Sequence, residues 1–187
     1  TLFKSLDKKK ADATSKELAD IWAPKAEQAK KLSDAMESYI DSLKIELKQG
    51  SGLTMEDGVE KYKEDDLNAT SRIFDTDKKG QQLDARLKAY RAALLNIDPQ
   101  IKAAFENTLP LEVVEGKDGT TPNFRMMPTV ASITLLSKIQ NNIKNSENQV
   151  ITFAHNKIGE VALRMDQAAV LVGQSSNYVM PGEEVTI

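Results

Sequence analysis

The chain has 187 residues, of which 40% are hydrophobic and 28% are charged, and its net charge is −3 at pH 7. This composition is typical of an ordinary globular domain, and the lack of a basic excess argues against binding to a nucleic-acid backbone. Because the sequence contains no cysteine, disulfides, thiolate metal sites and cysteine nucleophiles are excluded.

Both ends of the sequence are expected to continue into a longer protein. The chain begins at Thr1 rather than Met and ends at Ile187 within an alternating pattern that is typical of strands. Residues 1–13 carry Lys4, Lys8, Lys9 and Lys10 around few apolar positions. They are expected to form either a solvated end or the segment that follows a membrane anchor. The sequence itself has no run of about 18 apolar residues that would predict a transmembrane helix.

Residues 14–49 are predicted to form a long amphipathic helix. Their apolar residues recur at helical spacing on one face, namely Leu18, Ile21, Trp22, Ala29, Leu32, Met36, Tyr39, Ile40, Leu43 and Leu47. Pro24 is expected to kink or divide this helix, because proline removes a backbone hydrogen bond and clashes with the preceding turn. Gly50-Ser51-Gly52 is expected to end it.

The next segment is polar and is predicted to contain short elements. Residues 53–81 are rich in turn-forming residues, with one short helical turn expected at 66–74. Residues 82–96 are predicted to form a helix, because Leu83, Leu87, Tyr90 and Leu94 lie on one side of it.

Asp98-Pro99 is a typical helix start, in which the aspartate caps the helix and proline takes the first position. The short helix that follows is expected to end near Asn107. Residues 109–127 contain Pro110, Gly116, Gly119 and Pro122 and are predicted to form a long loop, with a short strand considered at 111–114.

The strongest pattern in the sequence is a second long helix, predicted over residues 128–158. Its apolar stripe consists of Ile133, Leu136, Ile139, Ile143, Val150, Ile151, Ala154 and Ile158. Pro128 suits the first helical position, and Gly159 is expected to cap the end. A helix of about 31 residues is roughly 46 Å long and needs an equally long partner to cover its stripe. We expect it to lie alongside the helix of residues 14–49.

Two polar residues, Gln140 and Glu147, project into this stripe beside Ile143 and Val150. Glu147 is expected either to lie at the edge of the stripe and reach water, or to make a register-fixing contact across a helix–helix or subunit interface. The residues predicted to form an interface are Gln140, Ile143, Glu147, Val150 and Tyr178.

After Gly159 the pattern changes toward strands. Residues 168–172 are strand-like, residues 173–177 form a turn cluster, and the strand pattern resumes at Tyr178. The predicted fold is therefore mainly α: an elongated helical bundle framed by two long helices, with a short β segment at the C-terminus. Residues 1–160 are predicted to form the bundle, and residues 161–187 to start a following β domain.

No pattern in the sequence predicts catalysis. The single histidine, His155, cannot build a histidine-rich metal site or a hydrolase triad without further partners. Asp75-Thr-Asp77-Lys-Lys-Gly80 resembles the start of a calcium loop, but Lys79 and Arg86 occupy two of the positions that need oxygen ligands. The sequence contains no phosphate-binding loop. We therefore predict no catalytic, cofactor-binding or metal-binding residue and no enzymatic activity.

Three stretches of the sequence resemble the GldM/PorM family of gliding-motility and type IX secretion proteins. They are Phe124-Arg-Met-Met-Pro128, the segment from Leu135 to Ile151, and Ser175-Ser-Asn-Tyr-Val-Met-Pro-Gly-Glu183. Ile73-Phe74 and the region 83–90 fit more loosely. The Asn and Gln placements in the long helix make the match specific, because a generic amphipathic helix would not need them.

The resemblance implies the periplasmic segment of a homodimeric protein that is anchored in the inner membrane by one N-terminal helix. In that family the membrane helix pairs with a GldL/PorL-type protein to form a proton-driven motor, and the far end engages a GldK/GldN-type outer-membrane ring. The implied function of this segment is force transmission, without nucleic acid or small-molecule substrate. The alternative is an adaptor that binds secretion cargo or a partner protein through the 108–127 loop.

Overall fold

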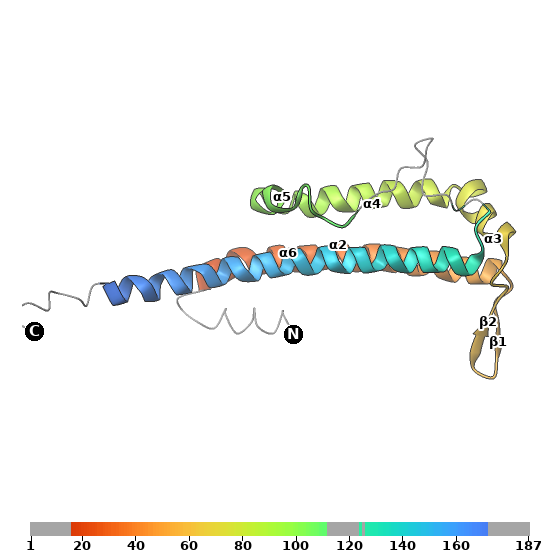
Figure 1. Ribbon diagram of the computed structural model, residues 1–187, viewed down its shortest axis with the longest axis horizontal. Coiled ribbons are helices and arrows are strands. Elements are labelled where there is room, and N and C mark those ends of the chain that lie inside the picture. The colour runs from red at the N-terminus through yellow and green to blue at the C-terminus, as the bar shows by residue number, and fades with distance from the viewer. Residues whose placement is uncertain (1–15, 112–123, 125, 172–187) are drawn as a thin grey trace, which may run out of the picture. The chain divides into compact units, whose positions relative to one another are not determined.

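The computed structural model of the chain describes residues 16–111, 124 and 126–171, with residues 160–171 as backbone alone. The described chain is mainly helical (Figure 1). Its elements are α2 (Lys16–Gly50), β1 (Thr54–Glu56), β2 (Val59–Lys61), α3 (Leu67–Ser71), the π-helix η1 (Arg72–Thr76), α4 (Lys79–Leu95), α5 (Pro99–Phe105) and α6 (Thr129–Leu171). The chain divides into two compact units, residues 1–24 with 153–187, and residues 25–152.

Helix α2 runs through Pro24 without interruption, so the predicted division at this proline is wrong, and the alternative kink stays a prediction. A proline inside a helix costs about 3 kcal/mol. Burial of the helix on both sides of it, at Trp22 and Ala26, offsets that cost. The helix ends where predicted: Ser51 N–H donates to Leu47 O, and Gly52 has a φ of +78° that glycine adopts without strain.

Within the unit of residues 25–152, α2 and α6 lie side by side, as predicted, and they run antiparallel. The hydroxyls of Ser51 and Thr129 are 2.7 Å apart near the end of α2 and the start of α6. Farther back along α2, Glu37 Oε1 is 3.0 Å from Lys144 Nζ. In this unit the predicted stripe of α6 is buried at Leu136, Ile143, Val150 and Ile151 and half-buried at Ile133 and Ile139. The hydrophobic pattern therefore identified the core of the α2–α6 pair.

Helix α4 packs along α2 in the opposite direction. Lys79 Nζ is 3.7 Å from Glu46 Oε2 at one end of the contact, and the hydroxyls of Tyr90 and Ser33 are 2.8 Å apart farther along. Leu83, Leu87, Tyr90 and Leu94 are buried, as the helical pattern predicts. The central helix α2 therefore contacts both α4 and α6.

In the unit formed by residues 1–24 and 153–187, the edge of Trp22 meets the ring of Phe153 at a centroid distance of 5.7 Å. Lys157 Nζ lies 5.3 Å from the same ring. Ala19, Trp22, Ala154 and Ile158 are buried, so the apolar faces of both helices continue into this unit.

Helix α6 continues past Gly159 to Leu171, so the predicted cap at Gly159 and the predicted strand at 168–171 are wrong. Glycine inside a helix costs only about 1 kcal/mol, which is too little to end a long helix by itself. A short apolar run such as residues 168–172 has no period that distinguishes a strand from a helix. The remaining predicted β residues, 172–187, lie outside the described residues. The proposed domain boundary at 160 falls within α6, and the division into domains stays a prediction.

The polar segment after α2 contains a β-hairpin that the sequence analysis missed. Strands β1 and β2 pair antiparallel with Glu56 opposite Val59, and Asp57 and Gly58 form the turn with φ of 52° and 78°. An Asp-Gly pair between two short strands is the typical signal of this turn. The predicted helical turn at 66–74 is confirmed by α3 and η1, and the Asp66 carboxylate caps α3. Of the predicted loop at 109–127, residues 112–123 and 125 lie outside the described residues.

Asp98 joins α5 to α2, as well as capping α5 as predicted. One carboxylate oxygen accepts a hydrogen bond from Gln100 N–H at 2.7 Å, and the other lies 2.5 Å from Lys25 Nζ. The hydrogen bond from Lys25, assisted by that from Gln100, holds the pKa of Asp98 below its ordinary value of 3.8 despite partial burial. A carboxylate with a lowered pKa stabilises the fold above its unfolded pKa, and this contribution is lost as the pH falls through the folded-state pKa.

Asp98→Ala is expected to lower the free energy of unfolding by about 1–2 kcal/mol at pH 7, because it removes both the cap and the ion pair. Asp98→Asn keeps the cap acceptor and is expected to lose less than half of that amount. Urea unfolding at pH 7 and pH 3 measures both effects. An Asp98→Ala variant that is as stable as the parent at pH 7 would contradict the assignment.

Candidate functional site

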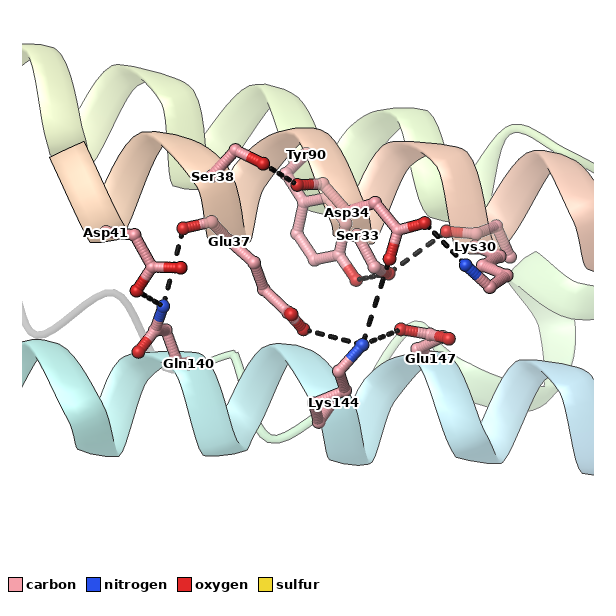
Figure 2. Close-up of polar contacts among 11 residues, drawn as sticks. Lys30, Ser33, Asp34, Glu37, Ser38, Asp41, Tyr90, Gln140, Lys144 and Glu147 are labelled. Atoms are coloured by element: carbon pink, nitrogen blue, oxygen red, sulfur yellow. Dashed lines mark hydrogen bonds and ion pairs between the residues drawn. The ribbon is translucent and has the colours of Figure 1, made fainter.

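A polar cluster lies between the helices at the middle of the α2–α6 contact (Figure 2). Lys144 of α6 is its centre, because its Nζ lies 3.0 Å from Glu37 Oε1, 3.1 Å from Glu147 Oε2 and 3.9 Å from Asp34 Oδ1. Lys30 lies 2.6 Å from the other oxygen of Asp34. We call these five residues the Lys144 cluster. It combines three carboxylates and two ammonium groups from two helices.

Glu147 is the most buried charge of the cluster, since its side chain is only 7% exposed. It lies on the apolar stripe of α6, where an unpaired carboxylate would be costly. Lys144 stands three residues earlier on the same helix, close enough to pair with Glu147, and it reaches Glu37 and Asp34 of α2 as well. Glu147 is therefore tied to the neighbouring helix through Lys144 and does not reach water at the edge of the stripe.

One turn farther along the helices, Gln140 makes a second set of contacts. Its amide nitrogen donates to Asp41 Oδ1 at 2.7 Å and to the backbone oxygen of Glu37 at 3.4 Å. Its amide oxygen accepts a hydrogen bond from Lys44 Nζ. Figure 2 shows Gln140 and Lys144 pointing from α6 toward the same face of α2.

Tyr90 brings α4 into this polar region. Its hydroxyl lies 2.8 Å from Ser33 Oγ, which donates to the backbone oxygen of Ala29 at 3.0 Å. Burial raises the pKa of Tyr90 to about 12; the hydrogen bond with Ser33 acts against this shift, and the charges of Glu147 and Glu37 add to it. Tyr90 is therefore a neutral hydroxyl at physiological pH.

Each charge of the Lys144 cluster lies beside an opposite charge, although the three carboxylates outnumber the two ammonium groups. Burial alone would lower the pKa of the Lys144 ammonium, but its hydrogen bonds and charge interactions with Glu37 and Glu147 outweigh burial and raise that pKa. The arrangement favours one alignment of α6 on α2, because a shift by one turn would separate Lys144 from Glu37 and Asp34 of α2, while Lys144 and Glu147 would move together.

Of the five predicted interface residues, four occur on α6 within the described residues. Ile143 and Val150 have no exposed surface in the single chain, Glu147 is buried, and Gln140 is half-buried. Tyr178 lies outside the described residues. The structure brings the four together along α6, and their role between subunits stays a prediction.

The contacts of Lys144 and Gln140 with α2 were not predicted from the sequence. Asp34, Glu37 and Asp41 follow one another at spacings of three and four residues, which places them along one face of the helix. The available signal was this line of acids beside the apolar face of α2, together with Lys144 next to the stripe of α6.

Outside the Lys144 cluster, other candidate sites in the described residues are few. Within the described parts of the chain, no group of three or more His, Asp or Glu residues is arranged to hold a metal ion. A cleft of about 510 Å³ between α4 and α5 has Lys88, Arg91, Lys102 and Glu106 in its wall. In residues 16–111, 124 and 126–171, no helix contains a stretch apolar and long enough to span a bilayer.

Lys144→Met is expected to lower the free energy of unfolding by about 2 kcal/mol, because it leaves the buried Glu147 carboxylate without its cation. Glu147→Met is expected to be neutral or stabilising, because Lys144 keeps Glu37 and Asp34 while the stripe becomes fully apolar. Urea unfolding compares the two variants with the parent. Equal destabilisation by both substitutions would contradict this expectation, because it would show that the Glu147 carboxylate itself stabilises the fold.

Comparison with known proteins identifies the family of this helical chain. A comparison with curated proteins found no significant match. The family model described as the GldM N-terminal domain matches residues 1–156, which is most of the sequence. The chain therefore belongs to the GldM family, whose members are components of gliding motility and type IX secretion.

Proposed function

We propose that this chain is a force-transmitting periplasmic module of a type IX secretion and gliding motor, with no enzymatic activity. The observation that carries the proposal is the α2–α6 pair, in which two long helices are held in one alignment by the Lys144 cluster. The segment from Pro24 to Gly50 alone is about 27 residues, or roughly 40 Å of helix. Such a pair resists bending through its packed core and resists sliding through its polar contacts.

The proposal extends to the place of the module in the motor. We propose that the full protein is a homodimer anchored in the inner membrane and that its membrane helix engages a GldL/PorL-type partner. Further C-terminal domains would reach a GldK/GldN-type outer-membrane ring. Membership in the GldM family supports this arrangement.

The antiparallel course of α2 and α6 limits how force can pass through residues 25–152. The chain runs out along α2 and back along α6, so Lys25 and Thr152 both lie at the end away from the Ser51–Thr129 contact. Force along the helix axes therefore passes between α2 and α6 through side chains rather than along the backbone. This gives the Lys144 cluster and the contacts of Gln140 a mechanical role.

The alternative, an adaptor that binds cargo through the 108–127 loop, has less support. Three described residues of that region, Leu109, Leu111 and Phe124, are buried. Phe124 stacks on Phe74 of η1 with a centroid distance of 3.8 Å. These contacts anchor the loop to the bundle, although Thr108 and Met126 remain exposed.

A disulfide between the end of α2 and the start of α6 distinguishes the force-transmitting module from the adaptor. Ser51 and Thr129 are buried with their hydroxyls 2.7 Å apart, and the chain has no cysteine of its own. The double variant Ser51→Cys/Thr129→Cys in the full-length protein is expected to form a staple and to keep secretion and gliding, because a rigid module need not open.

Ile143→Ala is the second variant of this test, because the cavity that it leaves lowers the free energy of unfolding by about 2–5 kcal/mol. This variant is expected to reduce secretion and gliding, and the staple is expected to restore them. Each single cysteine variant, and the stapled protein under a reductant, serve as controls. Loss of secretion on stapling, with normal secretion in both single variants, would overturn the rigid module and favour an adaptor that opens.

A further inference from the structure

The β1–β2 hairpin contributes no buried side chain to the fold. Every residue from Thr54 to Lys61 is exposed, including Met55 at 65% and Val59 at 61%. A two-stranded hairpin is marginally stable by itself, and burial of an apolar face would ordinarily support it. Figure 1 shows the hairpin projecting from the region where α2 ends. Its exposed apolar side chains are therefore available for contact with another molecule.

The hairpin is nevertheless held in place. Lys48 of α2 lies 2.5 Å from Glu60 and 5.8 Å from the ring of Tyr62. Beyond the strands, Lys63 N–H donates to Ser51 O, and Val130 N–H donates to Glu64 O. These contacts fix the hairpin and its flanks to the ends of both long helices, so a partner bound there would be coupled to α2 and α6.

The strand edges and the charges define what the hairpin can bind. Within the described chain the sheet has only these two strands, so each keeps an outer edge with unpaired backbone groups. Residues 54–66 carry six carboxylates and two lysines. Met55 lies opposite Glu60 and Val59 lies opposite Glu56, so each face of the sheet combines an apolar and an acidic side chain.

We propose that the β1–β2 hairpin docks an extended, lysine- or arginine-rich segment of a partner protein, which adds to the hairpin as a third strand. Backbone pairing supplies part of the binding, and the alternating side chains of the segment meet Met55, Val59 and the carboxylates on the two faces. A second copy of this chain is the poorer occupant, because its own hairpin carries the same negative charge. The proposal rests on the hairpin alone and is independent of force transmission.

Photo-crosslinking in cells that carry the full-length protein tests this proposal. A photoreactive phenylalanine replaces Met55 or Val59, and Ile45, an apolar α2 residue that is 53% exposed, is the matched control position. Met55 and Val59 are expected to crosslink to one segment of another protein with a net positive charge, and Ile45 is not. Mass spectrometry of the crosslinked peptides identifies the segment.

Charge variants complete the test. Glu56→Gln/Asp57→Asn/Glu64→Gln is expected to reduce the crosslink yield at least fivefold. The matched variant Glu17→Gln/Asp20→Asn/Glu27→Gln, at exposed positions of α2, is expected to leave the yield unchanged. Unchanged thermal unfolding of both variants controls for folding. A crosslink to a second copy of the chain, a crosslink to a neutral or acidic segment, or no crosslink from either hairpin position would overturn the proposal.

Discussion

The fold depends on covering one long apolar stripe. Residues of α6 from Leu136 to Ile158 present buried side chains at regular helical intervals, and no short element could shield them. Within residues 25–152, α2 meets this need from the same chain by running antiparallel to α6. Burial of these side chains supplies most of the favourable free energy of the pair, at about 1.5–3 kcal/mol for each large residue. Helices α4 and α5 are joined to α2 by polar contacts. The hydroxyl of Tyr90 contacts Ser33, and the carboxylate of Asp98 pairs with Lys25.

Apolar packing holds α6 against α2 but does not by itself fix their alignment. A shift by one turn can replace one leucine or isoleucine contact with another. Polar groups remove this freedom. The buried Glu147 keeps Lys144 beside it on α6, and Lys144 in turn pairs with Glu37 and Asp34 of α2 only in this alignment. The same contacts add little net stability, because Glu147 loses water on burial and the other charges of the cluster stay partly in water. Their contribution is therefore to the alignment of the two helices, which is the property that a force-transmitting pair needs.

The sequence predicted the helices well because the period of apolar residues over 20 or more positions has one interpretation. It predicted the caps at Gly50 and Asp98 from local chemistry. The predictions of a helix end at Gly159 and of a strand at residues 168–171 were wrong. One glycine and one short apolar run do not show from the sequence alone that the surrounding helix continues through them. Of the candidate site, Gln140 and Glu147 stood out as polar residues in a stripe. Their partners Asp34, Glu37 and Asp41 did not, because only the antiparallel pairing brings residues about 100 positions apart together.

The dependence of the unfolding temperature on protein concentration tests most directly whether α2 covers α6 within one chain. The same helix contacts would form between two chains if the helices were exchanged in a dimer, and folding would then require association. Circular dichroism of the 187-residue chain over a hundredfold range of concentration is expected to give one unchanged unfolding temperature. An unfolding temperature that rises with concentration would contradict coverage within the chain and would place the α2–α6 contacts between subunits.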